Sequence, residues 1–510
     1  MPHNPLTFLL QKVVKDAFKK TTAQTHNESR RKFIKEGAII AGGIGLIPSF
    51  ATAFVGDKKP VISIIGAGMA GMNAAYQLLK MGLDAKVYEA SARTGGRMFT
   101  IRDKFGENIT TDIGGEYVDT THTDIIDLAK ELDVHFYDLR EDNHASQTFY
   151  FDGRLLSNED LRNAILPFVE KIETDVMSLP PVINHTTAEK FQHLDKLSIT
   201  EYISKLGITG WLFDFLNVVL TREYGMEASE QSAINLLIMF TQPAGANQAY
   251  ELFGDEHEVL KITGGSQHLT NELQKKIKEN ILLNHQLQSI QKTAKGYTLD
   301  FSMKGQPKKI NTDYVILAIP FTILRKLHFE VPMQIEKRNC INKLGYGNSG
   351  KFIMGVNNKP WRTAGQKGYT FSDLEFGCGW DSSLMQSERE GSFTIFGGGN
   401  FMSDICGKQN DLIAKKFNPQ LGRIYPGFAK AYNKKNVKFC WGNYAHTKAG
   451  YSSFKKGQWS TLAGWEQIPV GNIYFAGEHT SLDFQGYMNG AAKTGREAAE
   501  MIAKAVSREQ

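Results

Sequence analysis

One segment near the start of the chain narrows the choice of fold more than any other. Residues 61–65 read Val-Ile-Ser-Ile-Ile, which is typical of a parallel strand buried on both faces, and residues 66–71 read Gly-Ala-Gly-Met-Ala-Gly. Gly66 allows a tight turn, Gly68 lets a pyrophosphate approach the backbone, and Gly71 lets the next helix pack close to the strand. The segment therefore predicts the first strand and turn of a dinucleotide-binding domain.

The residues that follow complete this pattern. Residues 72–81 are expected to form a helix, and residues 85–88 a second strand that ends at Glu89. A carboxylate at the tip of that strand accepts hydrogen bonds from a ribose and repels a 2′-phosphate. The amino terminus of the helix is expected to face the phosphates. The pattern alone does not choose between NAD and FAD.

The sequence beyond Glu89 makes that choice through a resemblance. Residues 89–97, Glu-Ala-Ser-Ala-Arg-Thr-Gly-Gly-Arg, resemble the E-A-x-x-R-x-G-G-R stretch of the flavin monoamine oxidase and L-amino acid oxidase superfamily. Residues 111–118 resemble its D-x-G-G-x-x-V segment, which passes beside the isoalloxazine ring. Near the carboxyl end, residues 472–480 and 486–492 are similar to its F-A-G-E strand and G-Y-x-x-G-A helix. The resemblance spans residues 60–503 and implies FAD as the cofactor.

The resemblance also implies which residues hold FAD. Arg93 and Arg97 are expected to serve the diphosphate and the flavin edge, and Glu478 the ribityl chain. The amide of Met488, at a helix amino terminus, is expected to face the flavin N1 and C2 carbonyl, where negative charge accumulates. Leu287 falls where the family places a Val whose backbone meets the adenine. The expected set is Gly66, Gly68, Ala70, Gly71, Glu89, Ala90, Arg93, Gly96, Arg97, Gly114, Gly115, Glu116, Leu287, Gly477, Glu478, Tyr487 and Met488.

The implied fold class is α/β, the amine oxidase fold. A Rossmann-like FAD-binding domain is expected from three chain segments, 60–136, 262–322 and 440–503. Two insertions, 137–261 and 323–439, are expected to form an α+β substrate-binding domain. Within them, residues 232–240 have a helix-like pattern and residues 351–356 a strand-like one.

Members of the superfamily oxidise a C–N bond: hydride moves from the α-carbon of a neutral amine to flavin N5, water hydrolyses the imine, and O2 becomes peroxide. Lys351 matches the family lysine that holds a water near N5. Tyr451 and Tyr487 match the two positions whose rings flank the amine nitrogen and exclude water. Gly450 stands where mitochondrial-type relatives have a Cys joined to flavin, so the FAD of this chain is expected to be noncovalent.

The expected substrate is an amine without an α-carboxylate. L-amino acid oxidases place an Arg soon after the Gly-Gly-Arg region to clamp that carboxylate, whereas residues 114–120 of this chain contain acids and no Arg. Arg222 or Arg362, from the insertions, could supply another clamp, so L-amino acid oxidase remains an alternative. A second alternative is a flavin dehydrogenase or desaturase that passes electrons to a periplasmic acceptor. A redox-inactive flavoprotein is disfavoured by the presence of Lys351 and the tyrosine pair.

The amino-terminal region has the order of a twin-arginine export signal. Arg30-Arg31 precede an apolar stretch, 37–50, and then Ala-Thr-Ala at 51–53. The expected cleavage follows Ala53, and the expected location is the periplasm. The apolar stretch is shorter than the roughly 20 residues of a membrane span, so no stable membrane anchor is expected. A disordered basic tail, or an organellar presequence built on the Lys-rich residues 9–20, is the alternative interpretation.

The charge and cysteine patterns exclude other classes. The formal net charge is +5, and all of that excess lies in residues 1–53, so the expected mature protein lacks the basic surface that nucleic acid requires. Four cysteines, Cys340, Cys378, Cys406 and Cys440, show neither zinc-ligand nor redox spacing, so no metal is expected. They are interpreted as buried thiols, with one disulfide left open for an exported chain. The expected partners are a small amine or amino acid, O2 and the twin-arginine machinery, and a homodimer is left open.

Overall fold

The computed structural model describes residues 59–142, 145–240, 258–387 and 389–509 of the 510-residue chain. The predicted export signal, with Arg30, Arg31 and Ala53, lies outside the described residues, and it therefore stays a prediction. Within the described ranges, no helix combines the length and the apolar character that crossing a bilayer demands.

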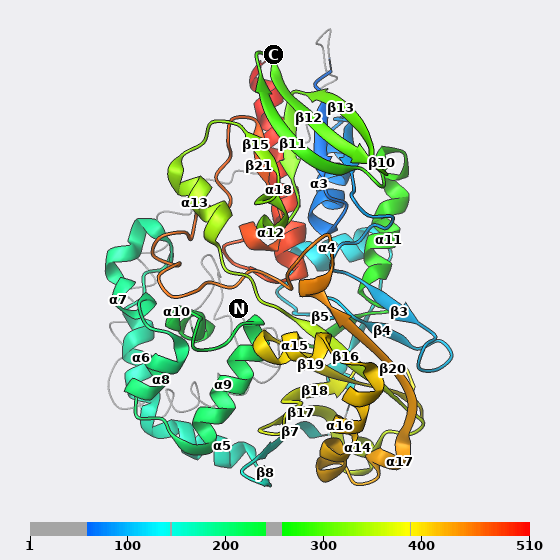
Figure 1. The fold of residues 1–510 in the computed structure, drawn as a ribbon, viewed down its shortest axis with the longest axis vertical. Helices are drawn as coiled ribbons and strands as arrows, with labels where there is room; N and C mark the ends of the chain where they lie inside the picture. The colour runs from blue at the N-terminus through cyan, green and yellow to red at the C-terminus, as the bar shows by residue number, and fades with distance from the viewer. Residues whose placement is uncertain (1–58, 143–144, 241–257, 388, 510) are drawn as a thin grey trace.

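A five-stranded parallel sheet lies in the upper half of the molecule in Figure 1. Its strand order is β10-β2-β1-β14-β21, and every pair of neighbours is parallel. The strands are β1 (Ile62–Ile65), β2 (Ala85–Tyr88), β10 (Ile281–Leu282), β14 (Tyr314–Leu317) and β21 (Ile473–Phe475). Three distant stretches of chain therefore meet in one sheet, and the two strands predicted near residues 61–65 and 85–88 are confirmed.

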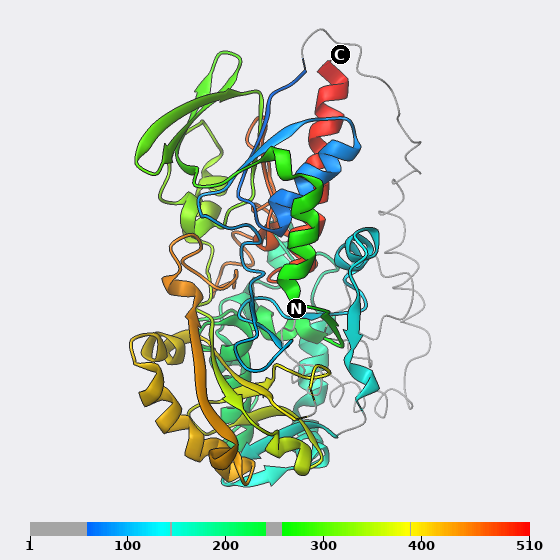
Figure 2. The same cartoon turned by 90° about the vertical axis from the view of Figure 1, so that its right-hand side faces the viewer.

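Helices cover one face of this sheet and a second, smaller sheet covers the other. Figure 2 shows α3 (Met69–Lys80), α11 (Ser266–Lys276) and α18 (Met488–Glu509) side by side. The opposite side carries a four-stranded sheet in the order β13-β12-β11-β15. Its strands are β11 (Gln286–Thr293), β12 (Gly296–Met303), β13 (Gln306–Thr312) and β15 (His328–Glu330). The central strands are consequently buried on both faces, as their apolar sequences require.

The first helix begins earlier than the sequence pattern predicts. The expected helix started at residue 72, whereas α3 starts at Met69. The cause is the carbonyl of Gly68, which already accepts the first helical hydrogen bond from the Met72 amide at 3.0 Å. The helix therefore begins directly after Gly68, and its amino terminus lies closer to the glycine turn than predicted.

A seven-stranded sheet lies in the lower half of the molecule, beside a group of helices (Figure 1). Its order is β20-β16-β19-β18-β17-β7-β8, and β16 (Gly350–Val356) includes the strand predicted at 351–356. The other strands are β7 (Ala145–Phe151), β8 (Arg154–Leu156), β17 (Gln366–Ser372), β18 (Cys378–Asp381), β19 (Gly391–Gly397) and β20 (Tyr432–Cys440). The helices beside it in the chain are α5 (Asn158–Ile165), α6 (Val169–Met177), α7 (Gln192–Asp195), α8 (Ile199–Lys205), α9 (Gly210–Tyr224), α10 (Ala233–Leu237), α13 (Ile335–Lys343), α14 (Pro360–Thr363), α15 (Gly399–Cys406), α16 (Asn410–Ile424) and α17 (Phe428–Ala431).

Short elements join the two halves. A three-stranded sheet, β5-β9-β6, pairs strands from residues 117–118, 260–262 and 136–138. The others are β3 (Thr100–Arg102), β4 (Thr110–Asp112), α4 (Thr123–Glu131) and α12 (Phe321–Leu324). These elements bring the segment around residue 116 and the segment around residue 260 into direct contact.

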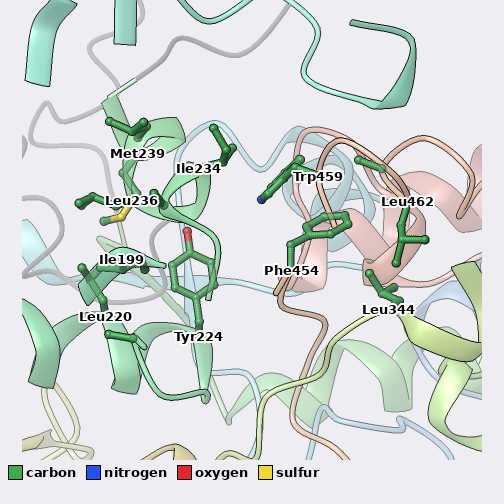
Figure 3. Close-up of a cluster of buried hydrophobic side chains, with 14 of the residues drawn as sticks. Ile199, Leu220, Tyr224, Ile234, Leu236, Met239, Leu344, Phe454, Trp459 and Leu462 are labelled. Atoms are coloured by element: carbon green, nitrogen blue, oxygen red, sulfur yellow. The ribbon is translucent and has the colours of Figure 1, made fainter. Parts of the chain in front are cut away.

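A buried apolar cluster fixes the loop that follows β20. Figure 3 shows Phe454 and Trp459 of this loop beside Tyr224 and Ile234 of the helical region. The rings of Phe454 and Trp459 lie 4.1 Å apart between centroids, and the Trp459 indole donates a hydrogen bond to the Asn235 side chain at 2.7 Å. Burying two aromatic residues contributes several kcal/mol to folding. The loop from residue 441 to 472 is therefore a packed part of the fold.

Two of the four cysteines form a disulfide, and the other two are free thiols. Cys406, at the end of α15, forms a disulfide with Cys440, at the end of β20. Cys340 and Cys378 are buried free thiols. The interpretation as buried thiols is thus confirmed for two of the four, and the disulfide that the sequence left unpaired joins the other two.

Candidate active site

A cavity of about 500 Å³ opens at the carboxyl ends of the parallel strands and continues toward the seven-stranded sheet. Among the residues predicted to bind FAD or to act in catalysis, all except Gly71 line it. They come from stretches as distant in sequence as residues 65–98, 349–351 and 477–491. The structure therefore brings the predicted residues to one place.

The glycines of the first turn fit a bound diphosphate. A Cβ atom at Gly71 would lie 1.9 Å from the Gly66 carbonyl oxygen, so this glycine lets α3 pack against the turn, outside the cavity wall. Gly66 has a φ of +104°, and a Cβ there would lie 2.6 Å from the Ala318 carbonyl oxygen. A Cβ at Gly68 would meet nothing closer than 3.8 Å and would instead take up cavity space. The open approach to the backbone at Gly68 is what a phosphate requires.

Glu89 lines the cavity at the end of β2. Its two carboxylate oxygens accept hydrogen bonds from the amides of Ala67 and Ser91, both at 2.8 Å. Ala90 and Leu287 line the cavity beside it, and Leu287 is buried at the start of β11. Glu89 is thus held directly after β2, and its contact with a ribose stays a prediction.

A partly buried ion pair joins the first and last segments of the cavity wall. The Arg97 guanidinium donates to Glu478 Oε1 at 2.8 Å and to the Gly450 carbonyl at 2.6 Å. Glu478 also accepts from the Ser452 hydroxyl at 2.7 Å and the Gly486 amide at 2.9 Å. Burial by itself would raise the pKa of Glu478, but the charge of Arg97 and the hydrogen bonds from Ser452 and Arg97, acting together with the neighbouring His479, lower that pKa. Glu478 is therefore an anion that fixes the loop below α18.

Arg93 is engaged locally. Its guanidinium donates to the carbonyls of Thr94 at 3.0 Å and Gly96 at 2.5 Å, and it lies over the Phe99 ring at 4.0 Å from the centroid. These contacts place a fixed positive charge on the cavity wall near the glycine turn. The charge suits a diphosphate, whose oxygens carry negative charge.

Lys351 is the centre of a buried network at the other end of the cavity. Its ammonium donates to the carbonyls of Asp112 at 2.8 Å and Gly114 at 3.0 Å, and to Glu116 Oε2 at 2.7 Å. Lys261 donates to the second oxygen of Glu116 at 2.7 Å. Burial would raise the pKa of Glu116, but the two lysines outweigh it and lower that pKa. Glu116 is thus a carboxylate bound by two lysines, and Lys351 is the one of them that lines the cavity.

Tyr451 and Tyr487 line the same end of the cavity from different elements. Tyr451 belongs to the packed loop and donates a hydrogen bond to the Glu223 carbonyl at 2.5 Å. Tyr487 directly precedes α18, and its ring meets the His122 ring edge-on at 4.8 Å. Next to it, Met488 begins the 22-residue helix, whose first amides have no intrahelical acceptor. The amino terminus of α18 therefore faces the cavity with a partial positive charge.

Sequence reasoning missed part of the site. Trp380 on β18 and Phe396 on β19 line the cavity, with their rings 5.4 Å apart, and Trp441 lines it as well. Two further residues were missed: Glu258, which precedes β9 and lines the cavity, and Lys261, which lies on β9 and binds Glu116. For Trp380 and Phe396, the sequence offers only the apolar pattern of a buried strand, and that pattern does not indicate a functional site. Nothing local distinguished Lys261 or Glu258 from ordinary charged residues.

His479, next to Glu478, gives a pH-dependent prediction. Burial lowers the pKa of His479 to about 3, so the folded protein keeps it neutral, whereas it gains a proton near pH 6.5 when unfolded. The contribution of neutral His479 to the free energy of unfolding is complete above pH 6.5, and it declines as the pH falls toward 3. Relative to His479→Leu, the native protein should therefore lose about 3 kcal/mol of unfolding free energy between pH 7.5 and pH 4.

Denaturant unfolding of both proteins at the two pH values measures that difference. Burial raises the pKa of Glu466 to about 7, so this residue stabilises the fold as the pH falls from 7. Both proteins contain Glu466, and its effect therefore cancels in the comparison. Equal pH slopes in the two proteins would show that His479 is protonated inside the fold.

Comparisons with known proteins identify the family. The family model "Flavin containing amine oxidoreductase" matches residues 69–503. The chain is 24% identical over 471 residues to amine oxidase [flavin-containing] A of Equus caballus, covering 88% of this chain and 85% of that protein. It is 25% identical over 479 residues to amine oxidase [flavin-containing] B of Bos taurus, covering 89% and 88%.

Two solved structures share the fold. Cyclohexylamine oxidase from Brevibacterium oxydans has a TM-score of 0.78 at 20% identity, covering 88% of this chain and 100% of that one. Putrescine oxidase bound to putrescine has a TM-score of 0.75 at 19% identity, covering 88% and 99%. Because the family model spans most of the chain and the predicted FAD residues other than Gly71 line one cavity, the chain belongs to the flavin-containing amine oxidoreductases and is an FAD-dependent enzyme.

Proposed function

We propose that this enzyme catalyses the oxidative deamination of a primary amine that lacks an α-carboxylate. The balanced reaction converts R–CH2–NH2, O2 and H2O into R–CHO, NH3 and H2O2. Bound FAD supplies the redox chemistry, because it can accept a hydride from the carbon next to the nitrogen. The protein residues bind and orient the amine, exclude water and hold fixed charges.

The main support for a substrate without an α-carboxylate is that the cavity offers no available arginine among the described residues. Among the described residues, the arginines that line it are Arg93 and Arg97, and both are engaged by the cavity wall. A substrate carboxylate buried without a cationic partner would cost several kcal/mol. The acids Glu116 and Glu258, which also line the cavity, add repulsion.

The two arginines that could have supplied a clamp from the insertions are committed elsewhere. Arg222 donates to the Gly398 carbonyl at 3.0 Å and lies over the Phe401 ring. Arg362 pairs with Asp142 at 2.6 Å. Neither is among the residues that line the cavity. These contacts favour an amine over an amino acid as the substrate.

Tyr451 and Tyr487 are the residues we assign to the reacting nitrogen. Their ring faces carry negative potential and exclude water, which suits an amine that approaches between them. Lys351 is held at the cavity wall by its contacts with Glu116 and two carbonyls. The end of the cavity near Lys351 is thus lined by the aromatic rings of Tyr451 and Tyr487 and by one lysine side chain.

The reaction is tested by product balance. Purified enzyme with an amine in air should yield aldehyde, ammonia and peroxide in equal amounts. Reduction by the amine under argon, with no peroxide formed after air is admitted, would instead identify a dehydrogenase with another electron acceptor. Rapid reoxidation in air, followed by stopped flow, supports the oxidase.

We expect the FAD to be noncovalent. Gly450 carries no sulfur to form a thioether, and a Cβ atom at this position would lie only 2.7 Å from Ser349 Cβ, so the site excludes even a small side chain. Acid precipitation should therefore leave a colourless pellet and a yellow supernatant. A pellet that stays yellow after washing would contradict this prediction.

We also propose that the enzyme is exported to the periplasm by the twin-arginine route. The Arg30-Arg31 signal supports this proposal. The Cys406–Cys440 disulfide supports it as well, because disulfides persist in oxidising compartments. Twin-arginine export carries folded proteins, so FAD would be bound before export.

A further inference from the structure

Glu258 is a buried carboxylate that the proposed reaction does not use. It lies two residues before β9 (Leu260–Ile262), is 6% exposed and lines the cavity. Within the described parts of the chain, its carboxylate has neither a hydrogen-bond partner nor an ion-pair partner, and Oε2 is fully covered. Its backbone is held in place, because its amide donates to Asp119 Oδ1 at 2.8 Å. The side chain therefore lies at the cavity wall without a counter-charge.

The nearby cations are already engaged. Lys261 and Lys351 each bind one oxygen of Glu116 at 2.7 Å. Residues 241–257, which precede Glu258 in the chain, contain three acids and no Lys or Arg. An ionised carboxylate that is buried without a partner costs several kcal/mol. A cationic ligand in the cavity would remove this cost.

Other carboxylates reinforce the demand for a cation. Burial raises the pKa of Glu258 well above its usual range, and the charges of Asp119 and Glu223 raise it further. The same three carboxylates act on Tyr487, whose pKa is raised mainly by burial and then by their charges. Burial and these charges favour the protonated form of Glu258 when no cation is near, and a positively charged group beside its carboxylate would favour the ionised form instead.

The nitrogen that Glu258 would bind is not the one that reacts. Hydride loss requires a neutral amine with a free lone pair, whereas a buried carboxylate stabilises the protonated, unreactive form. The tyrosine pair is the site assigned to the neutral nitrogen. Tyr117, Trp380 and Phe396 also line this end of the cavity and offer apolar surface to a carbon chain. A carbon chain along that surface would separate two nitrogens in different protonation states.

We propose that Glu258 binds a second, protonated amino group of the substrate, and that the substrate class is aliphatic diamines. This inference rests on the proposed amine oxidation, since one nitrogen must react while the other is held. Simple monoamines would leave Glu258 without its counter-ion and should be poorer substrates. Glu258 is thereby a specificity-determining residue, with no part in the redox step.

The test compares 1,5-diaminopentane with pentylamine, which has the same carbon chain and lacks the second amine. The FAD-loaded wild-type enzyme should have a kcat/KM at least about tenfold higher for the diamine, mainly through KM. Glu258→Gln should remove that preference by lowering kcat/KM for the diamine at least about tenfold, mainly through a higher KM. Glu466→Gln, which alters a buried acid outside the cavity, should retain it.

A binding measurement separates this inference from the proposed function. Pentane-1,5-bis(trimethylammonium) cannot be oxidised at nitrogen, and its dissociation constant, from the visible spectrum of the enzyme, should be at least about tenfold lower than that of pentyltrimethylammonium. Equal affinities, or an equal preference in wild type and Glu258→Gln, would overturn the inference even if both amines are oxidised. Failure to oxidise either amine would overturn the proposed function, and the affinities would still decide the role of Glu258. If Glu258→Gln fails to bind FAD, the preference for the diamine is compared between the wild type and Glu258→Asp, and that comparison decides whether Glu258 binds the second amino group.

Discussion

Replacing Lys351 with Met should slow the reoxidation of reduced enzyme by O2 at least tenfold, while substrate affinity changes little. The substitution removes the buried cation that lines the cavity, and it leaves the carbonyls of Asp112 and Gly114 without their donor. Stopped-flow mixing of reduced enzyme with O2 measures the rate directly. Titration with the amine under argon measures the affinity.

Lys261 provides a matched control for this substitution. It is as buried as Lys351 and binds the same Glu116 carboxylate at the same distance of 2.7 Å, but it does not line the cavity. Lys261→Met should therefore reoxidise within about threefold of the wild-type rate. Equal slowing in both variants would indicate a general electrostatic effect on the fold. Normal reoxidation with poor substrate affinity in Lys351→Met would place Lys351 in the substrate pocket.

Replacing Arg30 and Arg31 together by Lys should abolish export and leave active, FAD-loaded enzyme in the cytoplasm. The export receptor reads the paired arginines, whereas the substitution preserves charge and lies upstream of the residues that the family model matches. Fractionation of the cells, followed by activity and FAD measurement in each fraction, tests this. We expect the periplasmic pool to fall to background.

A charge-preserving control excludes an effect of any change in the leader. Lys12→Arg with Lys15→Arg retains the charge and creates no second arginine pair, so its export should be normal. An unchanged periplasmic yield from the Arg30/Arg31 variant would rule out twin-arginine export. Loss of export in the control alone would indicate that the amphipathic residues 9–20 carry the signal.

The sequence predicted those parts of the site whose chemistry depends on the local backbone. The role of Gly71 could be predicted because a Cβ atom there would lie only 1.9 Å from the Gly66 carbonyl oxygen. This requirement for glycine arises within six residues of sequence. The start of α3 was misplaced by three residues, because the cap at Gly68 depends on a backbone hydrogen bond that no side chain announces. The placement of Lys351 and Tyr487 in one cavity came from the family resemblance.

The missed residues depend on pairings between distant segments. Lys261 reaches Glu116 only because β9 pairs with β5, across 145 residues of sequence. Trp380 reaches the cavity through the register of β18 against β19, which the tertiary structure sets. The partner of Cys406 likewise follows from the contact between the end of α15 and the end of β20. None of these contacts has a local sequence signature.

The most direct test of the proposed function compares an amine with its α-amino acid parent. Catalytic efficiencies should be measured on tyramine against tyrosine and on cadaverine against lysine, with peroxide as the readout. Because Arg93, Arg97, Arg222 and Arg362 are all engaged within the protein, each amine should exceed its parent in kcat/KM by at least about tenfold. Consistently faster oxidation of tyrosine and lysine would contradict the account and identify an L-amino acid oxidase.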